Sequence, residues 1–246
     1  GLPATILALW PLAEYARSTI FTGFPWGLQA YAWVDTPLAQ IAAWTGPHGL
    51  GALTLALAAL PVLWCPRKGA AVSLIALIAL SLLGMMRLNN APNLSADAPI
   101  IRLTQPNAPQ HQKWDRAFMP IFFQRQINAT EAGPKPDLII WPETSLPNWL
   151  NDAERTLEHI SKAAKGTPVL IGAQRYEGVR SFNSLALLSG DGSIDHIYDK
   201  HHLVPFGEYL PFGAILSRLG LGTLTDAVGG FMPGTGPELI DLGAIG

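Results

Sequence analysis

Two long stretches without a charged residue constrain this chain more than any other feature of its sequence. They cover residues 36–66 and 69–86, and only the pair Arg67 and Lys68 separates them. A helix that spans a bilayer needs roughly 20 mostly apolar residues, and a charge at its centre costs about 3 kcal/mol. Both stretches meet this requirement. We therefore expect two membrane-spanning helices; the alternative is a buried helical hairpin in a large soluble protein.

The charged residues divide the chain into two parts of different character. Residues 1–92 hold six charged side chains, whereas residues 93–246 hold 28. We predict a transmembrane helical segment over the first part and a separate domain over the second. Only 14% of all residues are charged, against about a quarter in soluble domains, so the chain as a whole does not resemble a cytosolic globule. Its net charge of −2 gives no reason to expect a nucleic-acid partner.

Prolines and glycines locate the spans within the first part. The deep part of the first span is expected at 50–64 and the second span at 69–86, while residues 2–13 look like the end of a further span. The connector between the two spans is short and basic, through Arg67 and Lys68, and such connectors stay in the cytoplasm. The second domain is then expected on the opposite side of the membrane, which is the periplasm in a bacterium.

The segment 22–35, which precedes the first long uncharged stretch, is rich in aromatic residues. Trp26, Tyr31 and Trp33 suit the headgroup level of a membrane, where an aromatic ring keeps one edge in water. Two interpretations fit this pattern: a plain interfacial belt, or a periplasmic loop that forms part of a lipid-binding mouth.

Apolar strand-like runs alternate with helical patterns in the second part of the chain. Strands are expected at 100–105, 136–143, 167–175, 181–189 and 193–203, and amphipathic helices at 110–131 and 150–165. Pro120 is expected to kink the first of these helices, and the Gly-Asp-Gly run at 190–192 predicts a tight turn between the last two strands. The alternation predicts an α/β domain with a mixed sheet covered by helices.

Glu143 is a candidate for acid–base chemistry because it follows an apolar strand. Ligands tend to bind at that end of the strands in α/β sheets. Trp141 and Pro142 flank the carboxyl group, and poor solvation would raise its pKa and suit it to proton transfer. The alternatives are an acid at a helix N-terminus and a surface ion pair.

Lys200 and Glu208 are further candidates: Lys200 ends the strand IDHIYDK (194–200) and opens the loop that contains Glu208. A lysine in an apolar pocket can stabilise an oxyanion or hold a neighbouring nucleophile as its anion; the alternative is a solvated lysine at a strand end. Glu208 is either a supporting partner of the site or a plain loop acid. His201 and His202 are adjacent and make a poor metal pair, so we expect neither a metal nor a cofactor.

Four motifs resemble those of the nitrilase superfamily and, within it, of the apolipoprotein N-acyltransferase family. WPETSLP (141–147) is similar to the glutamate motif of the superfamily, and YDKHHLVPFGEYLPF (198–212) is similar to its lysine motif in the form found in that family. GFPWGLQ (23–29) and QPNAPQHQKW (105–114) are also similar to segments of the family. The resemblance covers nearly the whole chain and implies a nitrilase-like α-β-β-α sandwich preceded by transmembrane helices.

The resemblance also implies roles for individual residues. Glu143 would be the general base, Lys200 would stabilise the tetrahedral oxyanion, and Glu208 would support the site. Asn183 matches the family's YNS-type stretch, with Phe182 in the place of tyrosine. Substrate contacts would fall on four residues: Trp26, Trp114, Asn183 and Tyr209.

The reaction implied by the resemblance has two steps. A cysteine thiolate takes an acyl chain from the sn-1 position of a phospholipid, and the thioester passes that chain to the α-amine of the lipidated N-terminal cysteine of an apolipoprotein. Because both substrates are anchored in the membrane, the active site must lie at its outer surface. We therefore expect a multi-pass protein of the bacterial inner membrane, with its catalytic domain facing the periplasm, that acts as a monomer.

The sequence departs from the family pattern at the position of the nucleophilic cysteine. The family cysteine belongs to a CYE-like motif downstream of the lysine motif, whereas the only cysteine here is Cys65, in the connector predicted to be cytoplasmic. We expect the 246 residues to be an internal fragment of such an enzyme that cannot form the thioester. Two other functions stay open: a membrane-tethered amidase in which water attacks the thioester, and a non-catalytic lipid- or lipoprotein-binding pseudoenzyme.

Overall fold

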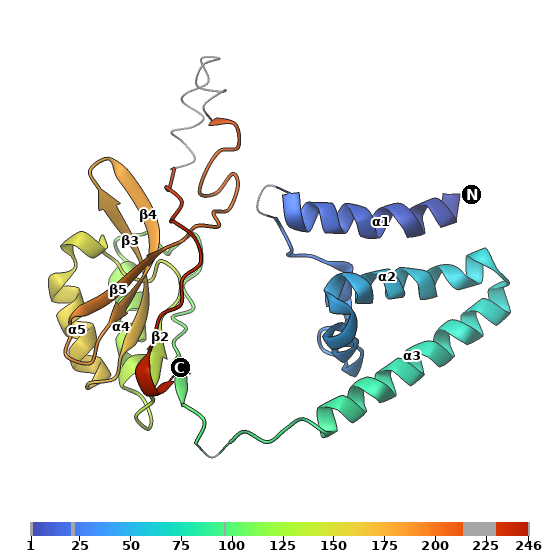
Figure 1. The fold of residues 1–246 in the computed structure, drawn as a ribbon, viewed down its shortest axis with the longest axis horizontal. Helices are drawn as coiled ribbons and strands as arrows, with labels where there is room; N and C mark the ends of the chain where they lie inside the picture. Colours follow the sequence, from blue (N-terminus) through green and yellow to red (C-terminus); the bar gives the residue numbers. More distant parts are fainter. Residues whose placement is uncertain (1, 21–22, 96, 214–229, 246) are drawn as a thin grey trace. The chain divides into compact units, whose positions relative to one another are not determined.

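The computed structural model describes residues 2–20, 23–95, 97–213 and 230–245. The chain divides into two compact units, Gly1–Leu94 and Ser95–Gly246, each of which is described by itself. Figure 1 shows helices α1 to α3 in the first unit, and a β-sheet with helices α4 and α5 in the second.

In the described part of the first unit there are three long helices and two short 3-10 turns. The helices are α1 (Leu2–Thr19), α2 (Ala42–Leu63) and α3 (Pro66–Asn89), and the turns are Gln29–Trp33 and Pro37–Ile41. Helix α2 contacts both α1 and α3. Helix α3 begins at Pro66, where a proline is tolerated because the first N–H of a helix has no partner.

Two segments of this unit are long and apolar enough to cross a membrane. Among the described residues these are Pro37–Leu63 and Pro66–Asn89. Only 17% and 11% of their apolar windows are buried, whereas the core helix of a soluble protein is mostly buried. The exposure favours membrane spans over a buried hairpin. Residues 2–13 do form a helix, as expected, but α1 continues to Thr19 and is not one of the two segments that pass this test.

Small residues allow α3 to approach its neighbours closely. Gly69, Ser73 and Gly84 are the buried residues of α3. A Cβ on Gly69 would lie 2.5 Å from a backbone carbonyl oxygen of α2, and one on Gly84 would overlap the backbone of the Pro37–Ile41 turn. The hydroxyl of Ser73 donates a hydrogen bond of 2.6 Å to the carbonyl of Leu57. Such contacts through small residues are typical of helices that pack within a membrane.

The described residues of the second unit form a five-stranded mixed sheet and two main helices. Its elements are β1 (Ile101–Leu103), α4 (Met119–Glu131), β2 (Leu138–Ile140), α5 (Glu154–Ala164), β3 (Val169–Glu177), β4 (Arg180–Leu188) and β5 (Ile194–Asp199). The strand order is β1-β2-β3-β4-β5. The pairs β1–β2 and β2–β3 are parallel, and the pairs β3–β4 and β4–β5 are antiparallel. All strands except β4 therefore run in the same direction.

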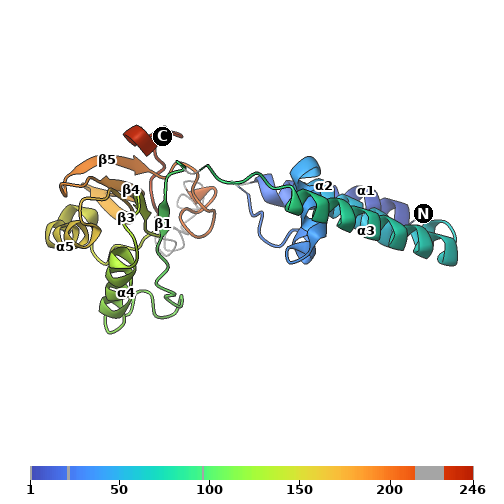
Figure 2. The same cartoon turned by 90° about the horizontal axis from the view of Figure 1, so that it is seen from below.

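One face of this sheet is covered by α4 and α5, which pack against each other (Figure 2). Ile171 of β3 and Ala186 of β4 are completely buried there, together with Ile160 of α5. Since successive side chains of a strand point to opposite faces, Gly172 and Leu185 point to the other face. The predicted mixed α/β sheet with helices is confirmed. Of the expected four-layer sandwich, the described residues form one helical layer and one sheet.

The long helix predicted at 110–131 is wrong in its first part. Residues 110–114 and 116–118 form turns, and α4 begins at Met119. Pro120 lies in the first turn of α4, so it starts the helix and does not kink it. The physical reason is that proline fits the first helical turn but removes a hydrogen bond further along.

Candidate active site

The topology of the sheet brings three predicted site residues to one edge. Glu143 follows β2 by three residues, and Lys200 directly follows β5. Because β4 runs in the opposite direction, Asn183 near its beginning lies at the same edge. The N–H of Lys200 donates a hydrogen bond of 2.8 Å to the carbonyl of Asn183. The directions of β2, β4 and β5 therefore bring Glu143, Asn183 and Lys200 together.

A compact network of hydrogen bonds joins four of the predicted side chains. The ammonium nitrogen Nζ of Lys200 lies 3.0 Å from Oε1 of Glu143 and 3.0 Å from Oε1 of Glu208. The amide Nδ2 of Asn183 donates to the same two oxygens, at 2.5 and 2.7 Å. The other carboxylate oxygen of Glu208 accepts the N–H of Val204 at 2.7 Å, and the Glu208 side chain is only 12% exposed. Glu208 thus anchors the network from a buried position.

Gly172 allows the loop that carries Glu143 to cross closely over β3. A Cβ on Gly172 would lie 2.6 Å from Cα of Glu143 and 2.7 Å from the nitrogen of Thr144, closer than real side chains come. The N–H groups of Ser145 and Leu146 donate to the carbonyl of Gly172 at 2.8 and 3.2 Å, so the loop is tied to the strand. Thr144 adopts a left-handed backbone with φ of +51°, which is uncommon for a residue with a side chain.

The predicted rise in the pKa of Glu143 is wrong. Burial does push the pKa of Glu143 upwards, but hydrogen bonds from Lys200 and Asn183 outweigh it and hold the pKa below its ordinary value. The charges of Lys200 and Lys113 act in the same direction. The Glu143 side chain is 60% exposed, so its solvation is better than its flanking residues suggest. Glu143 is therefore a carboxylate at neutral pH.

Lys200 stays protonated for a matching reason. Burial alone would lower the pKa of Lys200, but its hydrogen bonds to Glu143 and Glu208 raise it above the ordinary value. A protonated lysine cannot act as a base, but it can stabilise negative charge on a reacting oxygen. The carboxylate of Glu143 can accept a proton from a nucleophile within hydrogen-bond reach. The arrangement thus combines a base with an oxyanion-stabilising cation.

Glu143 stands between two cavities. The first, of about 260 Å³, is lined by Trp141, Gly172, Asn183, Leu185 and Lys200 in addition to Glu143. The second, of about 170 Å³, lies beside Lys113, Trp114, Met119, Phe122 and Leu146. Trp114, a predicted substrate contact, thus lies beside Glu143 but in a different cavity from Lys200.

The other candidates from the sequence lie elsewhere. Tyr209 lines neither of these two cavities; its backbone carbonyl accepts the N–H of Phe206 at 2.8 Å. Trp26 belongs to the first unit, where its side chain is 70% exposed. Cys65 also belongs to the first unit and caps the beginning of α3. No cluster of three or more His, Cys, Asp or Glu side chains is placed to bind a metal ion in the described ranges.

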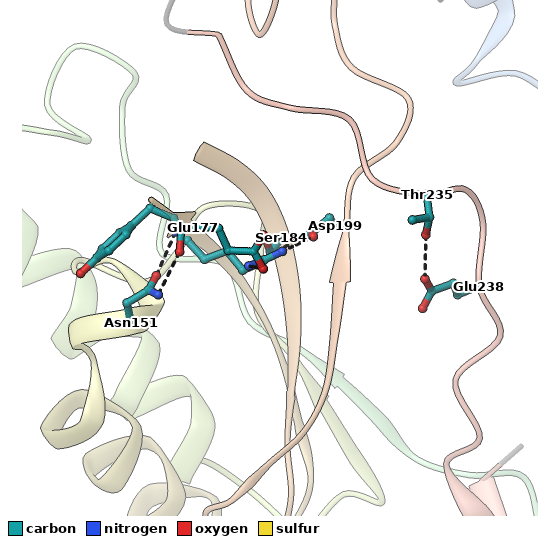
Figure 3. A network of polar contacts seen from close by, with 8 residues as sticks. Asn151, Glu177, Ser184, Asp199, Thr235 and Glu238 are labelled. Atoms are coloured by element: carbon teal, nitrogen blue, oxygen red, sulfur yellow. Dashed lines mark hydrogen bonds and ion pairs between the residues drawn. The ribbon is translucent and has the colours of Figure 1, made fainter. Parts of the chain in front are cut away.

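An ion pair lies next to the site, on the face of the sheet opposite to the Asn183 side chain. Ser184 and Asp199 are paired across β4 and β5, and Figure 3 shows their side chains next to each other. The hydroxyl of Ser184 donates to Asp199 at 2.7 Å, and Arg175 donates two bonds to the same carboxylate, at 2.8 and 2.5 Å. The guanidinium also lies 4.3 Å from the ring centroid of Phe182. Two of these residues are next to site residues in sequence: Ser184 follows Asn183, and Asp199 precedes Lys200.

Comparison with known proteins assigns the second unit to a family. The model of the carbon-nitrogen hydrolases matches residues 97–243, which is more than half of the chain. The chain belongs to the carbon-nitrogen hydrolase family. The model of the apolipoprotein N-acyltransferase N-terminal domain matches residues 1–60. Both matches agree with the resemblance drawn from the sequence motifs.

Curated relatives match nearly the whole chain. A protein of Brucella suis named apolipoprotein N-acyltransferase is 38% identical over 94% of this chain and 47% of its own length. A protein of Allorhizobium ampelinum with the same name is 36% identical over 98% of this chain and 49% of its own length. The chain thus spans about half the length of the curated relatives it matches.

The solved structures that resemble this chain are more distant in sequence. XC1258 from Xanthomonas campestris, described as a superfamily protein with an arsenic adduct in its active site, is 21% identical, with a TM-score of 0.30. The matched region covers 58% of this chain and 47% of the XC1258 chain. An N-terminal amidase is 16% identical over 46% of this chain and 28% of its own, also with a TM-score of 0.30. The family assignment therefore rests on the sequence match.

Two residues of this site were missed by reasoning from the sequence. Lys113 stands directly before Trp114 in the segment 105–114, and its place in that motif was the available signal. Gly172 interrupts an apolar strand, and a glycine there often marks a close backbone approach.

Proposed function

We propose that this chain takes part in the N-acylation of bacterial lipoproteins, as the glutamate–lysine site and adjoining membrane helices of an apolipoprotein N-acyltransferase. The observation that carries the proposal is the network of Glu143, Asn183, Lys200 and Glu208 beside an open cavity. The match of residues 1–60 to the N-terminal domain of these acyltransferases, and the names of the curated relatives, support this choice within the family.

In the first half of the reaction, Glu143 takes the proton of a cysteine thiol. The thiolate attacks the sn-1 ester carbonyl of a phospholipid, and the ammonium of Lys200 stabilises the tetrahedral oxyanion. The carbon–oxygen bond of the ester then breaks, and Glu143 returns the proton to the leaving glycerol oxygen. Lysophospholipid and an acyl-thioester result. Residues 93–246 contain no cysteine, and we do not assign the nucleophile to Cys65.

In the second half, the amine of the acceptor attacks the thioester. Glu143 takes a proton from the attacking nitrogen, and Lys200 again faces the oxyanion. The carbon–sulfur bond breaks as the amide forms, and Glu143 returns the proton to the leaving sulfur, which restores the thiol and the carboxylate. The acceptor is the α-amine of a lipidated N-terminal cysteine of an apolipoprotein.

The proposed location is the bacterial inner membrane. The two long apolar helices would span it, with the basic connector Arg67–Lys68 in the cytoplasm and the second unit in the periplasm. Both the donor and the acceptor are lipids or lipidated, so a monomer with its site at the membrane surface can reach them.

An acyl-transfer assay tests the proposal. The full-length gene product in membranes is given phosphatidylethanolamine labelled in its sn-1 chain and a peptide with a diacylglyceryl cysteine. We expect a labelled N-acyl peptide, and Glu143→Gln should lower its rate at least about 100-fold. Glu158→Gln is the control, because Glu158 is an exposed acid on α5. Labelled free fatty acid without N-acyl peptide would favour the amidase, and binding without turnover would favour the pseudoenzyme.

A further inference from the structure

Lys113 is a second cation beside Glu143, and the mechanism above does not use it. Its Nζ donates a hydrogen bond of 3.3 Å to the backbone carbonyl of Glu143. It also lies 5.3 Å from the ring centroid of Trp114, in the turns before α4. Lys113 thus stands on the side of Glu143 that faces the 170 Å³ cavity, whereas Lys200 faces the larger cavity.

The ammonium of Lys113 has unused hydrogen-bonding capacity. It carries three N–H donors. In the part of the chain that the structure describes, the carbonyl of Glu143 is its single hydrogen-bond acceptor. Burial lowers the pKa of Lys113, although the charge of Glu143 opposes this effect. A half-buried cation with two spare donors would be stabilised by an anionic ligand.

The cavity beside Lys113 has the character of a site for an amphipathic ligand. Met119, Phe122 and Leu146 give it apolar walls, and Lys113 provides a positive charge at the side next to Glu143. An anionic group on an apolar chain matches this combination, because the chain can fill the apolar part while the charge meets the ammonium.

We propose that Lys113 binds the phosphodiester of the phospholipid donor. This inference rests on the proposed function and names the residue that recognises the donor headgroup. In a glycerophospholipid, the phosphate and the sn-1 ester belong to one glycerol unit, so they must bind close together. Lys113 and Lys200 contact the same residue, Glu143, from two sides. The proposal places the phosphate of one lipid at Lys113 and its ester next to Lys200, with the glycerol unit passing Glu143, the residue that lines both cavities.

Donor discrimination tests this role in the full-length gene product. The donors are phosphatidylethanolamine and diacylglycerol with the same acyl chains, and KM and kcat are measured for each. For Lys113→Met we expect KM for phosphatidylethanolamine to rise about tenfold or more. KM for diacylglycerol and both kcat values should stay within about twofold. Lys113→Arg should restore most of the preference, because it keeps a charged donor. Lys162→Met is the control, since Lys162 is 72% exposed on α5.

A binding measurement separates this inference from the proposed function. Short-chain fluorescent phosphatidylethanolamine and its diacylglycerol analogue are titrated onto the detergent-solubilised protein, with and without Lys113→Met. A loss of affinity for the phospholipid alone supports the inference even if no acyl transfer is found. An equal loss for both lipids, or none, overturns it and leaves Lys113 as a support for the Glu143 loop. Displacement of the lipid by millimolar inorganic phosphate would show a free-phosphate site and would also overturn it.

Discussion

At the scale of single residues, Gly172 determines where Glu143 can lie. Its missing Cβ leaves room for the backbone of Glu143 and Thr144 to cross the sheet. Gly172→Ala is expected to displace this loop and to lower kcat for acyl transfer at least about tenfold, because a displacement of the base by about 1 Å has effects of this order or larger. Gly207→Ala is a matched control in the Glu208 loop. A Cβ there would only make an ordinary contact, 3.7 Å from Val204. Equal activity of both variants would contradict this account.

Asp199 gives the fold a pH dependence. Burial raises the pKa of Asp199, but hydrogen bonds from Arg175 and Ser184 outweigh it and hold that pKa below its ordinary value. A carboxyl group with a lower pKa in the folded chain stabilises the fold above its unfolded pKa of about 3.9. This contribution is lost as the pH falls through the pKa of the folded state.

Asp199→Asn is therefore expected to destabilise the fold in a pH-dependent way. At pH 7 the free energy of unfolding should fall by about 2 kcal/mol, because Arg175, whose side chain is only 15% exposed, loses the carboxylate that accepts two of its hydrogen bonds and keeps the exposed Glu177 as its ionic partner. Thermal unfolding in detergent measures the effect, with the exposed Asp97→Asn as control. The gap between Asp199→Asn and the unchanged protein should be smaller at pH 3 than at pH 7, because the contribution of the carboxylate declines once the pH falls below its unfolded pKa. A gap of the same size at both pH values would show that the ion pair is not its source.

At the scale of elements, α1 holds the aromatic segment 23–29 by its backbone. Arg17 donates to three carbonyls of this segment, the shortest bond being 2.9 Å to that of Trp26. Glu14 accepts the N–H of Gln29 at 2.9 Å. Glu14 and Arg17 are three positions apart on a helix and so share a face. They are the only charged residues of α1, which indicates that their role is to hold the segment in place.

Arg17→Met is expected to loosen this segment. Cys65 is the only cysteine of these 246 residues, so in this chain Cys65→Ser with Trp26→Cys gives a single site for a nitroxide label. Arg17 binds the carbonyl of residue 26, so the label leaves its bonds in place. Electron paramagnetic resonance should report higher mobility of the label in Arg17→Met. Arg87→Met, which removes a cation near another aromatic ring, should leave the spectrum unchanged. Unaltered mobility in Arg17→Met would mean that the segment is held by other contacts.

The sequence allowed most elements of the second unit to be predicted, because short apolar runs between turn residues indicate buried strands. It failed at residues 110–118, where apolar residues occur at helical spacing in a segment that forms turns. The spacing of apolar residues does not detect a helix start, whereas Pro120 could have marked it.

For the site, local sequence was enough to single out Glu143 and Lys200 but not to predict their ionisation. The hydrogen-bond donors that lower the pKa of Glu143 lie 40 and 57 residues away, at Asn183 and Lys200. The flanking Trp141 and Pro142 suggested burial, yet the side chain is mostly exposed. Only the three-dimensional arrangement shows which effect is larger.

At the scale of the whole molecule, the basic connector makes the membrane topology testable. Cys65 lies between α2 and α3, next to Arg67 and Lys68, and is expected in the cytoplasm. A membrane-impermeant maleimide should therefore label Cys65 in inverted membrane vesicles but not in intact spheroplasts. Labelling in intact spheroplasts would place the connector in the periplasm and would reverse the proposed orientation of the second unit.

Lys200 and Glu143 are proposed to carry out acyl transfer from a phospholipid together. The most direct test is the rate at which the full-length gene product with Lys200→Met converts labelled phosphatidylethanolamine into N-acyl peptide. We predict that kcat falls at least about 100-fold while KM for the phospholipid changes little, because the ammonium acts on the oxyanion and not on the bound ester. A kcat within about twofold of the unchanged protein would contradict the claim.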